Sequence, residues 1–296
     1  MGAVLFGIGY QQMGWLGHDA CHHGLTSNRK FNNFLGYVFG NLVSGFSVNW
    51  WKDRHNTHHA ITNVLESDPD VDNLPLFVWS ELEVPKWKLW PGMARTIIPY
   101  QHLYFVPWTV TLKLIWCLQS AFFVRNLELQ NKSYMKSLPA ERLLLVLHYI
   151  LLFFVLRLTP SFGAAVLFYL ISEFIGGAGI ALIVFMNHYS LEQIEKDKAL
   201  TTDFLGLQLL GTKNINPGIF MDWFAGGLNY QVEHHLFPTI PRHNLSKVKP
   251  LVEKFCKDND LPYQSETYYG CISAVLSKLR AVAGVYNKAT EKRQQK

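Results

Sequence analysis

The sequence is poor in charge and in cysteine, and it contains no internal repeat. Only 17% of its 296 residues are charged, with 27 Lys and Arg against 22 Asp and Glu. The basic residues are scattered, which excludes a nucleic-acid-binding stripe. The four cysteines lie far apart, which excludes a CxxC metal pair and the disulfide framework of a small secreted domain. With 49% hydrophobic residues, a disordered chain is excluded as well.

The amino-terminal segment lacks the features of a signal peptide. Residues 1–16 have no basic start and no small-residue cleavage site, and only Gln11 and Gln12 interrupt their apolar run. As a helix they would span about 24 Å, less than the roughly 30 Å of a bilayer core. We therefore expect residues 1–16 to be the end of a longer membrane helix, with further residues preceding them in the full protein.

Two long apolar runs are present further along the chain. Residues 143–158 are followed, after an uncharged link of three residues, by residues 162–186, in which Glu173 is the one charged residue. This pattern predicts a transmembrane hairpin. A third apolar stretch, residues 97–124, contains Lys113 and Pro107, which favours a helix lying in the membrane interface. Residues 187–296 are more polar and are expected to form a cytosolic helical cap.

Histidine is abundant, and eight of the twelve histidines fall into three clusters. Their sequences are HDACHH from residue 18, HNTHH from residue 55 and QVEHH from residue 231. Positions i, i+3 and i+4 share one face of a helix, so the imidazoles of each cluster can converge on a metal ion. A His-rich surface or an adventitious zinc site explains one such cluster, but it explains three together poorly.

The number of imidazoles favours two metal ions, because a structural zinc site closes with four ligands. Imidazole binds several transition metals, and iron suits oxygen chemistry on a lipid at a membrane surface. If the clusters share one site, an even number of membrane crossings must separate them, and the hairpin supplies two. Basic residues flank the clusters, among them Arg29, Lys30 and Lys213, whereas the hairpin link has none. The clusters are therefore expected on the cytosolic side.

These three boxes, with Gln231 opening the third, and the stretch NYQVEHHLFPTIPRHN from residue 229 resemble the membrane front-end fatty acyl desaturases of the delta-5 and delta-6 type. The resemblance covers essentially the whole chain. It implies an all-α integral membrane enzyme whose transmembrane hairpins lie under a cytosolic cap that holds a di-iron histidine site. It further implies oxygen-dependent insertion of a double bond between an existing one and the carboxyl end of a polyunsaturated fatty acyl chain. Electrons would come from NADH through cytochrome b5 reductase and cytochrome b5, at the endoplasmic reticulum membrane.

The resemblance also implies a set of iron ligands. It assigns the box histidines, adds a ninth histidine, and includes the glutamine of the third box: His18, His22, His23, His55, His58, His59, His188, Gln231, His234 and His235. Gln231 could bind iron directly, bind it through water, or orient a neighbouring ligand. Related enzymes carry an Asn four residues before the ninth histidine, where this chain has Val184, and Asn187 is a candidate substitute.

One departure from the family pattern concerns the amino terminus. Front-end desaturases usually begin with a fused cytochrome b5 domain and two membrane helices, which this sequence does not show. Residues 1–296 are therefore expected to be the desaturase domain, with cytochrome b5 fused upstream or separate. The alternatives are a related lipid hydroxylase, a sphingolipid desaturase, or an inactive membrane metal-binding relative.

Several other residues receive secondary interpretations. Asp19 and Glu233 lie off the ligand faces and are expected to orient histidines through the second ring nitrogen. Trp50 and Trp51 could line an acyl tunnel or anchor the chain at the interface. The cations Lys52, Arg54 and Arg242 could meet a coenzyme A phosphate or a lipid head group, or simply face the membrane. Asp68, Asp70 and Asp72 resemble the start of a calcium loop, but Asn73 replaces its turn glycine, so calcium is not expected.

Overall fold

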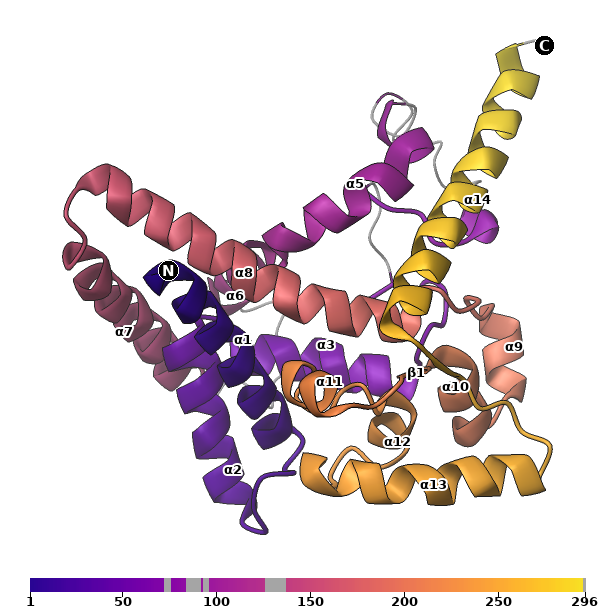
Figure 1. Ribbon diagram of the computed structural model, residues 1–296, viewed down its shortest axis with the longest axis horizontal. Coiled ribbons are helices and arrows are strands. Elements are labelled where there is room, and N and C mark those ends of the chain that lie inside the picture. Colours follow the sequence, from indigo (N-terminus) through magenta and orange to yellow (C-terminus); the bar gives the residue numbers. More distant parts are fainter. Residues whose placement is uncertain (72–75, 84–91, 93–95, 126–136, 295–296) are drawn as a thin grey trace.

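The computed structural model describes residues 1–71, 76–83, 92, 96–125 and 137–294, and it is mostly helical, as the sequence predicts (Figure 1). The first half contains α1 (Gly2–Cys21), α2 (Arg29–Gly36), the π-helix η1 (Tyr37–Ser44), α3 (Val48–Ala60), η3 (Ile98–Tyr100), α5 (Gln101–Trp108), η4 (Thr109–Thr111) and α6 (Leu112–Arg125). The second half contains α7 (Leu138–Arg157), α8 (Phe162–His188), α9 (Lys196–Thr201), α10 (Phe204–Gly211), β1 (Asn214–Ile215), α11 (Ile219–Phe224), α12 (Gln231–Leu236), α13 (Arg242–Asp258), β2 (Ser265–Glu266) and α14 (Tyr268–Gln294).

The two apolar runs of the sequence form α7 and α8, which are joined by residues 158–161 as a hairpin (Figure 1). Among the described residues, these are the two helices long and apolar enough to cross a membrane. The Ser161 hydroxyl caps the start of α8 by accepting a hydrogen bond from the amide of Ala164. Phe153 and Leu167 are among the many large apolar side chains that the hairpin exposes, as a lipid-facing surface requires.

Small residues allow α1 to pack closely against α8. A Cβ atom on Gly7 would lie 2.7 Å from the carbonyl oxygen of Ser172, and one on Gly177 would lie 2.8 Å from that of Val110. Glycine at these two positions therefore brings α1, α8 and η4 into backbone contact, as small residues do between membrane helices. This packing brings the first histidine box, at the end of α1, and His188, at the end of α8, to the walls of one cavity.

The segment expected to lie in the membrane interface, residues 97–124, is divided into η3, α5, η4 and α6. Pro99 lies in the first turn of η3, where proline is tolerated, whereas Pro107 lies inside α5, where its missing amide N–H and its ring disturb a regular helix. The four pieces follow one another without a break in the chain, and α6 packs on α8. Lys113 of α6 and Glu173 of α8 form an ion pair of 2.8 Å in which both side chains are buried.

Helix α3, which carries the second histidine box, is held at its amino end by a buried carboxylate from α7. The Ser47 hydroxyl accepts a hydrogen bond from the amide of Trp50 and donates one of 2.9 Å to Glu141. The Glu141 carboxylate also accepts from the amide of Asn49 at 3.1 Å. A carboxylate at a helix amino terminus stabilises the helix through its unpaired amides and its dipole. The position of α3 is therefore tied to the transmembrane hairpin.

The carboxy-terminal part contains α9 to α13 and a short parallel strand pair, β1 and β2, which an all-helical expectation does not include. The side chain of Asn214 in β1 accepts a hydrogen bond from the amide of Val232 and donates one to Glu233. These contacts anchor α12, which carries the third box, to β1. Helix α14 packs instead on α5 and η3, away from α12 (Figure 1).

Candidate metal centre

The histidine boxes meet where the ends of α1 and α8 approach α3 and α12, and their imidazoles form two groups. In each group the possible ligand atoms lie within 4.8 Å of one another. The first group combines all three boxes and consists of His18, His22, His55 and His234. The second group combines boxes two and three with the histidine of α8 and consists of His58, His188 and His235.

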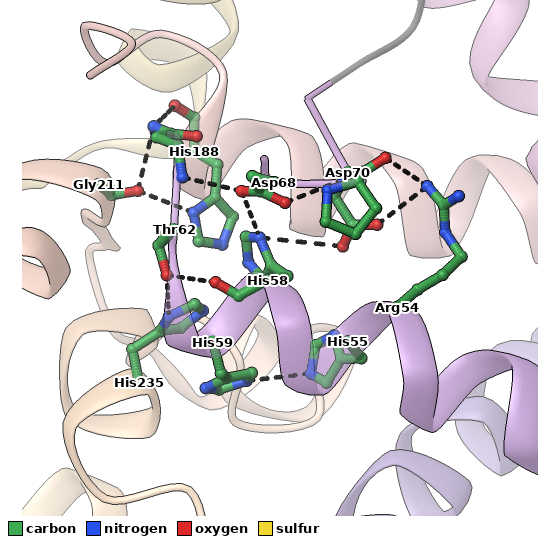
Figure 2. Close-up of polar contacts among 12 residues, drawn as sticks. Arg54, His55, His58, His59, Thr62, Asp68, Asp70, His188, Gly211 and His235 are labelled. Carbon is green, nitrogen blue, oxygen red and sulfur yellow. Dashed lines mark hydrogen bonds and ion pairs between the residues drawn. The ribbon is translucent and has the colours of Figure 1, made fainter. Parts of the chain in front are cut away.

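Two further box histidines occupy different positions. His59 lies between the groups: its Nε2 is 3.0 Å from Nε2 of His55, and its ring stacks on that of His235 at a centroid distance of 4.0 Å (Figure 2). His23 follows the end of α1 with a positive φ of 61° and belongs to neither group. His59 is therefore placed to bridge the groups, whereas His23 is a ligand candidate on the sequence pattern alone.

The outer ring nitrogens of the second group are held by fixed partners. Nδ1 of His58 lies 2.8 Å from the Asp68 carboxylate (Figure 2). Nδ1 of His188 is 2.8 Å from the carbonyl oxygen of Gly211, and Nδ1 of His235 is 2.9 Å from the side-chain oxygen of Gln208. These acceptors place the ring proton on Nδ1, so each Nε2 lone pair is directed toward the group. Such partners are typical of metal-binding histidines.

Within the described segments, one comparable anchor holds the first group, and two charged residues build it. Nδ1 of His18 is 3.2 Å from the Asp19 carboxylate, which is also paired with Arg242. Asp19 therefore orients a histidine, as the sequence predicts. Arg242 pairs with it through Nε, whereas its buried Nη2 has no hydrogen-bond partner among the described residues.

The Nε2 atoms, which face the interior of each group, are suited to bind a metal ion. Within the described part of the chain, no hydrogen-bond partner reaches the buried Nε2 atoms of His18, His22, His234 or His235. Buried polar atoms are normally satisfied, so a converging set without partners points to a ligand that is a metal ion. Three of these atoms belong to the first group and one to the second, and together the two groups fit a di-iron site.

The electrostatics favour the neutral imidazole that binds metal. Burial lowers the pKa of His22, His55 and His234, and neighbouring histidines lower it further. His58 differs: burial lowers its pKa, but the charge of Asp68 and its hydrogen bond outweigh burial and leave the pKa raised. Because metal and proton compete for the imidazole, the neutral histidines are ready to coordinate without losing a proton.

Gln231 lies beside the second group. Its side-chain nitrogen is 2.9 Å from Nε2 of His188, and its oxygen accepts a hydrogen bond of 3.1 Å from Asn187. Asn187 therefore holds Gln231 in place, while Val184 lines the adjacent cavity. Of the three roles open to Gln231 on sequence grounds, this contact favours orienting its neighbour His188.

Two carboxylates differ from the sequence interpretation. In the sequence, Asp68 was considered only as part of a rejected calcium loop, whereas in the structure it anchors His58. Its position ten residues after that histidine is the one sequence feature that could have indicated this contact. Asp72, of the same loop, lies outside the described residues. Glu233 contacts no ring of the two groups; it accepts hydrogen bonds from Asn214 and Tyr263, because it projects from the opposite side of α12. The expectation that Glu233 orients a histidine is therefore wrong.

Replacing Asp68 with Asn should weaken metal retention without removing a ligand. The amide can still accept a hydrogen bond from His58 but carries no charge, and loss of such an outer partner lowers metal affinity about 10- to 100-fold. Iron retained by the purified protein against a graded series of chelator concentrations measures the change. The exposed control Asp258→Asn should match the unaltered protein. Equal retention by Asp68→Asn would show that the Asp68 charge does not support the site.

A cavity of about 270 Å³ reaches both histidine groups. Its walls come from α1, α3, α5, α6 and α8, and they are rich in aromatic side chains, including Trp50, Trp51, Phe77 and Phe105. Trp50 and Trp51 are 5% and 7% exposed. They are therefore cavity wall and not anchors in the membrane interface. An elongated apolar substrate is the ligand that such a cavity suits.

Comparisons with known proteins agree with this site. The sequence model of the family described as fatty acid desaturase matches residues 1–267. The chain is 45% identical over 290 residues to the Delta(8)-fatty-acid desaturase of Euglena gracilis, covering 97% of this chain and 68% of that protein. It is 40% identical to the Delta(6)-fatty-acid desaturase fat-3 of Caenorhabditis elegans, covering 95% and 64%. It is 38% identical to the Delta(5) fatty acid desaturase fat-4 of the same organism, covering 98% and 65%.

The chain thus spans about two thirds of the length of these relatives. The family match covers all three histidine boxes and the cavity that they adjoin. The two apolar helices α7 and α8 agree with a membrane enzyme. This protein therefore belongs to the fatty acid desaturase family.

Proposed function

We propose that this protein is a membrane front-end desaturase, which uses dioxygen to insert a double bond between an existing one and the carboxyl end of a polyunsaturated fatty acyl chain. One observation carries the proposal: two groups of converging imidazoles, four of whose Nε2 atoms are buried without a partner among the described residues, adjoin an aromatic-lined cavity. The relatives named as Delta(8), Delta(6) and Delta(5) desaturases support the same conclusion.

The chemistry requires a redox metal because an unactivated methylene group has no acidic proton and no leaving group. Two non-haem iron ions, when bound, would supply the oxygen activation that removes its hydrogens. The first ion would be held by His18, His22, His55 and His234, and the second by His58, His188 and His235. His59 would lie between them, and His23 and Gln231 complete the proposed set. The protein's further contribution is to exclude water and to fix the acyl chain against the groups.

The proposal includes an orientation in the endoplasmic reticulum membrane. Helices α7 and α8 would cross the bilayer, residues 97–124 would lie in the interface, and residues 187–296 would cap the site on the cytosolic side. The hairpin returns the chain to the side from which it started, so all boxes can share one face. On that face, cytochrome b5, reduced by its reductase with NADH, would deliver electrons.

The proposed activity is tested by expressing the whole chain in a eukaryotic host that supplies cytochrome b5 and its reductase. Cells given a polyunsaturated fatty acid should form a product with two hydrogens fewer and a new double bond on the carboxyl side of the existing ones. Gas chromatography with mass spectrometry locates that bond. A hydroxylated product would identify a lipid hydroxylase instead, and purified iron-loaded protein that forms no product would contradict the proposal.

A further inference from the structure

The cavity adjoins an open hollow between α3 and α6. Three side chains, Trp50, Arg54 and Gln119, line both spaces. The hollow is completed by Asp53, Leu118, Phe122 and Phe123. Leu118 and Phe122 are 71% and 61% exposed, so the outer rim is apolar. An acyl chain bound in the cavity would therefore leave its carboxyl end at the shared residues, with the rest of the molecule outside.

Arg54 is held in a fixed position at this opening. Its guanidinium donates hydrogen bonds to the carbonyl oxygen of Pro69 and to the Asp70 carboxylate, the latter at 3.3 Å (Figure 2). Both contacts use Nη2, and an arginine carries further N–H donors on Nε and Nη1. The group also lies 5.9 Å from the ring centroid of Trp50. Arg54 therefore presents donors at the opening in a geometry that its neighbours determine.

The charges at the opening suit a neutral acceptor better than an anion. Among the described residues that line the hollow, Arg54 is the one cation, and Asp53 faces the same space. Asp70 offsets the charge of Arg54 directly. A phosphate would gain little net electrostatic attraction there, because the two carboxylates repel it. A carbonyl oxygen is neutral and would accept a guanidinium hydrogen bond without that repulsion.

We propose that Arg54, with Gln119 beside it, binds the carbonyl oxygen of the acyl group and thereby fixes the first carbon of the substrate. Thioesters and phospholipid esters share this carbonyl. The inference rests on the proposed function, because it assigns the substrate's carboxyl end to the opening of the same site.

This contact would set the position of the new double bond. Arg54 immediately precedes His55, and the Asp70 carboxylate extends from Arg54 to a point 3.9 Å from Nδ1 of His58. Arg54, His55 and His58 also line the same cavity, so a carbonyl held at Arg54 would place the first carbons of the chain beside the histidine groups. Carbons near the carboxyl end therefore reach the site, as a front-end desaturase requires.

The test compares substrates with and without the carbonyl. One pair is a polyunsaturated acyl-CoA and the S-alkyl-CoA in which a methylene replaces the carbonyl; the other is an ester phosphatidylcholine and its ether analogue. The whole chain is assayed as wild type, Arg54→Met, Arg54→Lys and Lys52→Met. Lys52 is a matched control, since it lies on the same helix but binds Asn33 at 2.9 Å outside both cavity linings.

The measured quantity is the ratio of desaturation rates within each pair. A hydrogen bond to a charged donor predicts that wild type prefers the carbonyl form about 10- to 100-fold. Arg54→Met should bring the ratio close to one and spread the double bond over neighbouring carbons. Arg54→Lys should restore part of the preference, and Lys52→Met should retain all of it. The pair that shows the preference identifies the natural source, coenzyme A ester or phospholipid.

Partial misfolding lowers both rates of a pair and leaves the ratio unchanged. If Arg54→Met turns over too slowly, the same ratio is measured from Kd values for the two members of a pair. An unchanged preference in Arg54→Met would overturn the inference while leaving the proposed function intact. If iron-loaded wild type forms no unsaturated product from any of these lipids, the proposed function fails and this inference fails with it.

Discussion

His58→Ala should abolish desaturation and release about half of the bound iron, because it removes one of the three imidazoles of the second group. It also leaves the Asp68 carboxylate, whose own exposure is 0%, without its histidine partner. Iron content of the purified protein and product formation in the expression host are the two measurements. His234→Ala removes a ligand from the first group and should give the same loss of activity.

A matched control distinguishes loss of a ligand from loss of any histidine. His243 is exposed in α13 and belongs to neither group, so His243→Ala should keep both iron and activity. Intact protein is checked by its elution from a sizing column in detergent. A His58→Ala or His234→Ala protein that still desaturates would contradict the ligand assignment, and full iron content in either would contradict it independently of activity.

The second large effect is expected at the buried ion pair of the membrane region. In Lys113→Met, the Glu173 carboxylate, which is 1% exposed, loses the ammonium 2.8 Å away. Removing one partner of a buried pair destabilises a protein by about 3–5 kcal/mol, because a desolvated charge remains. The corresponding decrease in Tm is about 10 °C for a chain of this size. Thermal unfolding in detergent measures it.

Two further variants identify the cause of that decrease. The double variant Lys113→Met with Glu173→Met removes both charges and should regain most of the lost Tm, since apolar replacement of a whole buried pair is often neutral or better. The exposed pair of Lys254 and Asp258 provides the control, and Lys254→Met should change stability by less than about 1 kcal/mol. If Lys113→Met unfolds at the unaltered temperature, the ion pair does not hold α6 to α8.

The sequence contained the parts of the site that depend on local geometry. Histidines three and four residues apart lie on one helix face wherever the helix is placed, so the boxes can be recognised from the sequence alone. The hairpin can also be predicted from the sequence, because crossing a bilayer requires a continuous apolar run. The partners of the Nδ1 atoms cannot be predicted in this way. Gly211 and Gln208, which hold His188 and His235, lie outside the histidine boxes, and nothing in the sequence marks them as partners.

What the sequence by itself determined, then, is membership in a desaturase family, a mostly helical chain with an apolar hairpin, and three histidine-rich segments. Only the tertiary structure decided how those histidines divide. His58 and His59 are neighbours, yet successive helical side chains point about 100° apart. His58 therefore joins His188 and His235, while His59 lies between the groups. The packing of α1, α8 and α12 around α3 decides which rings meet, because each group takes its members from helices far apart in the chain.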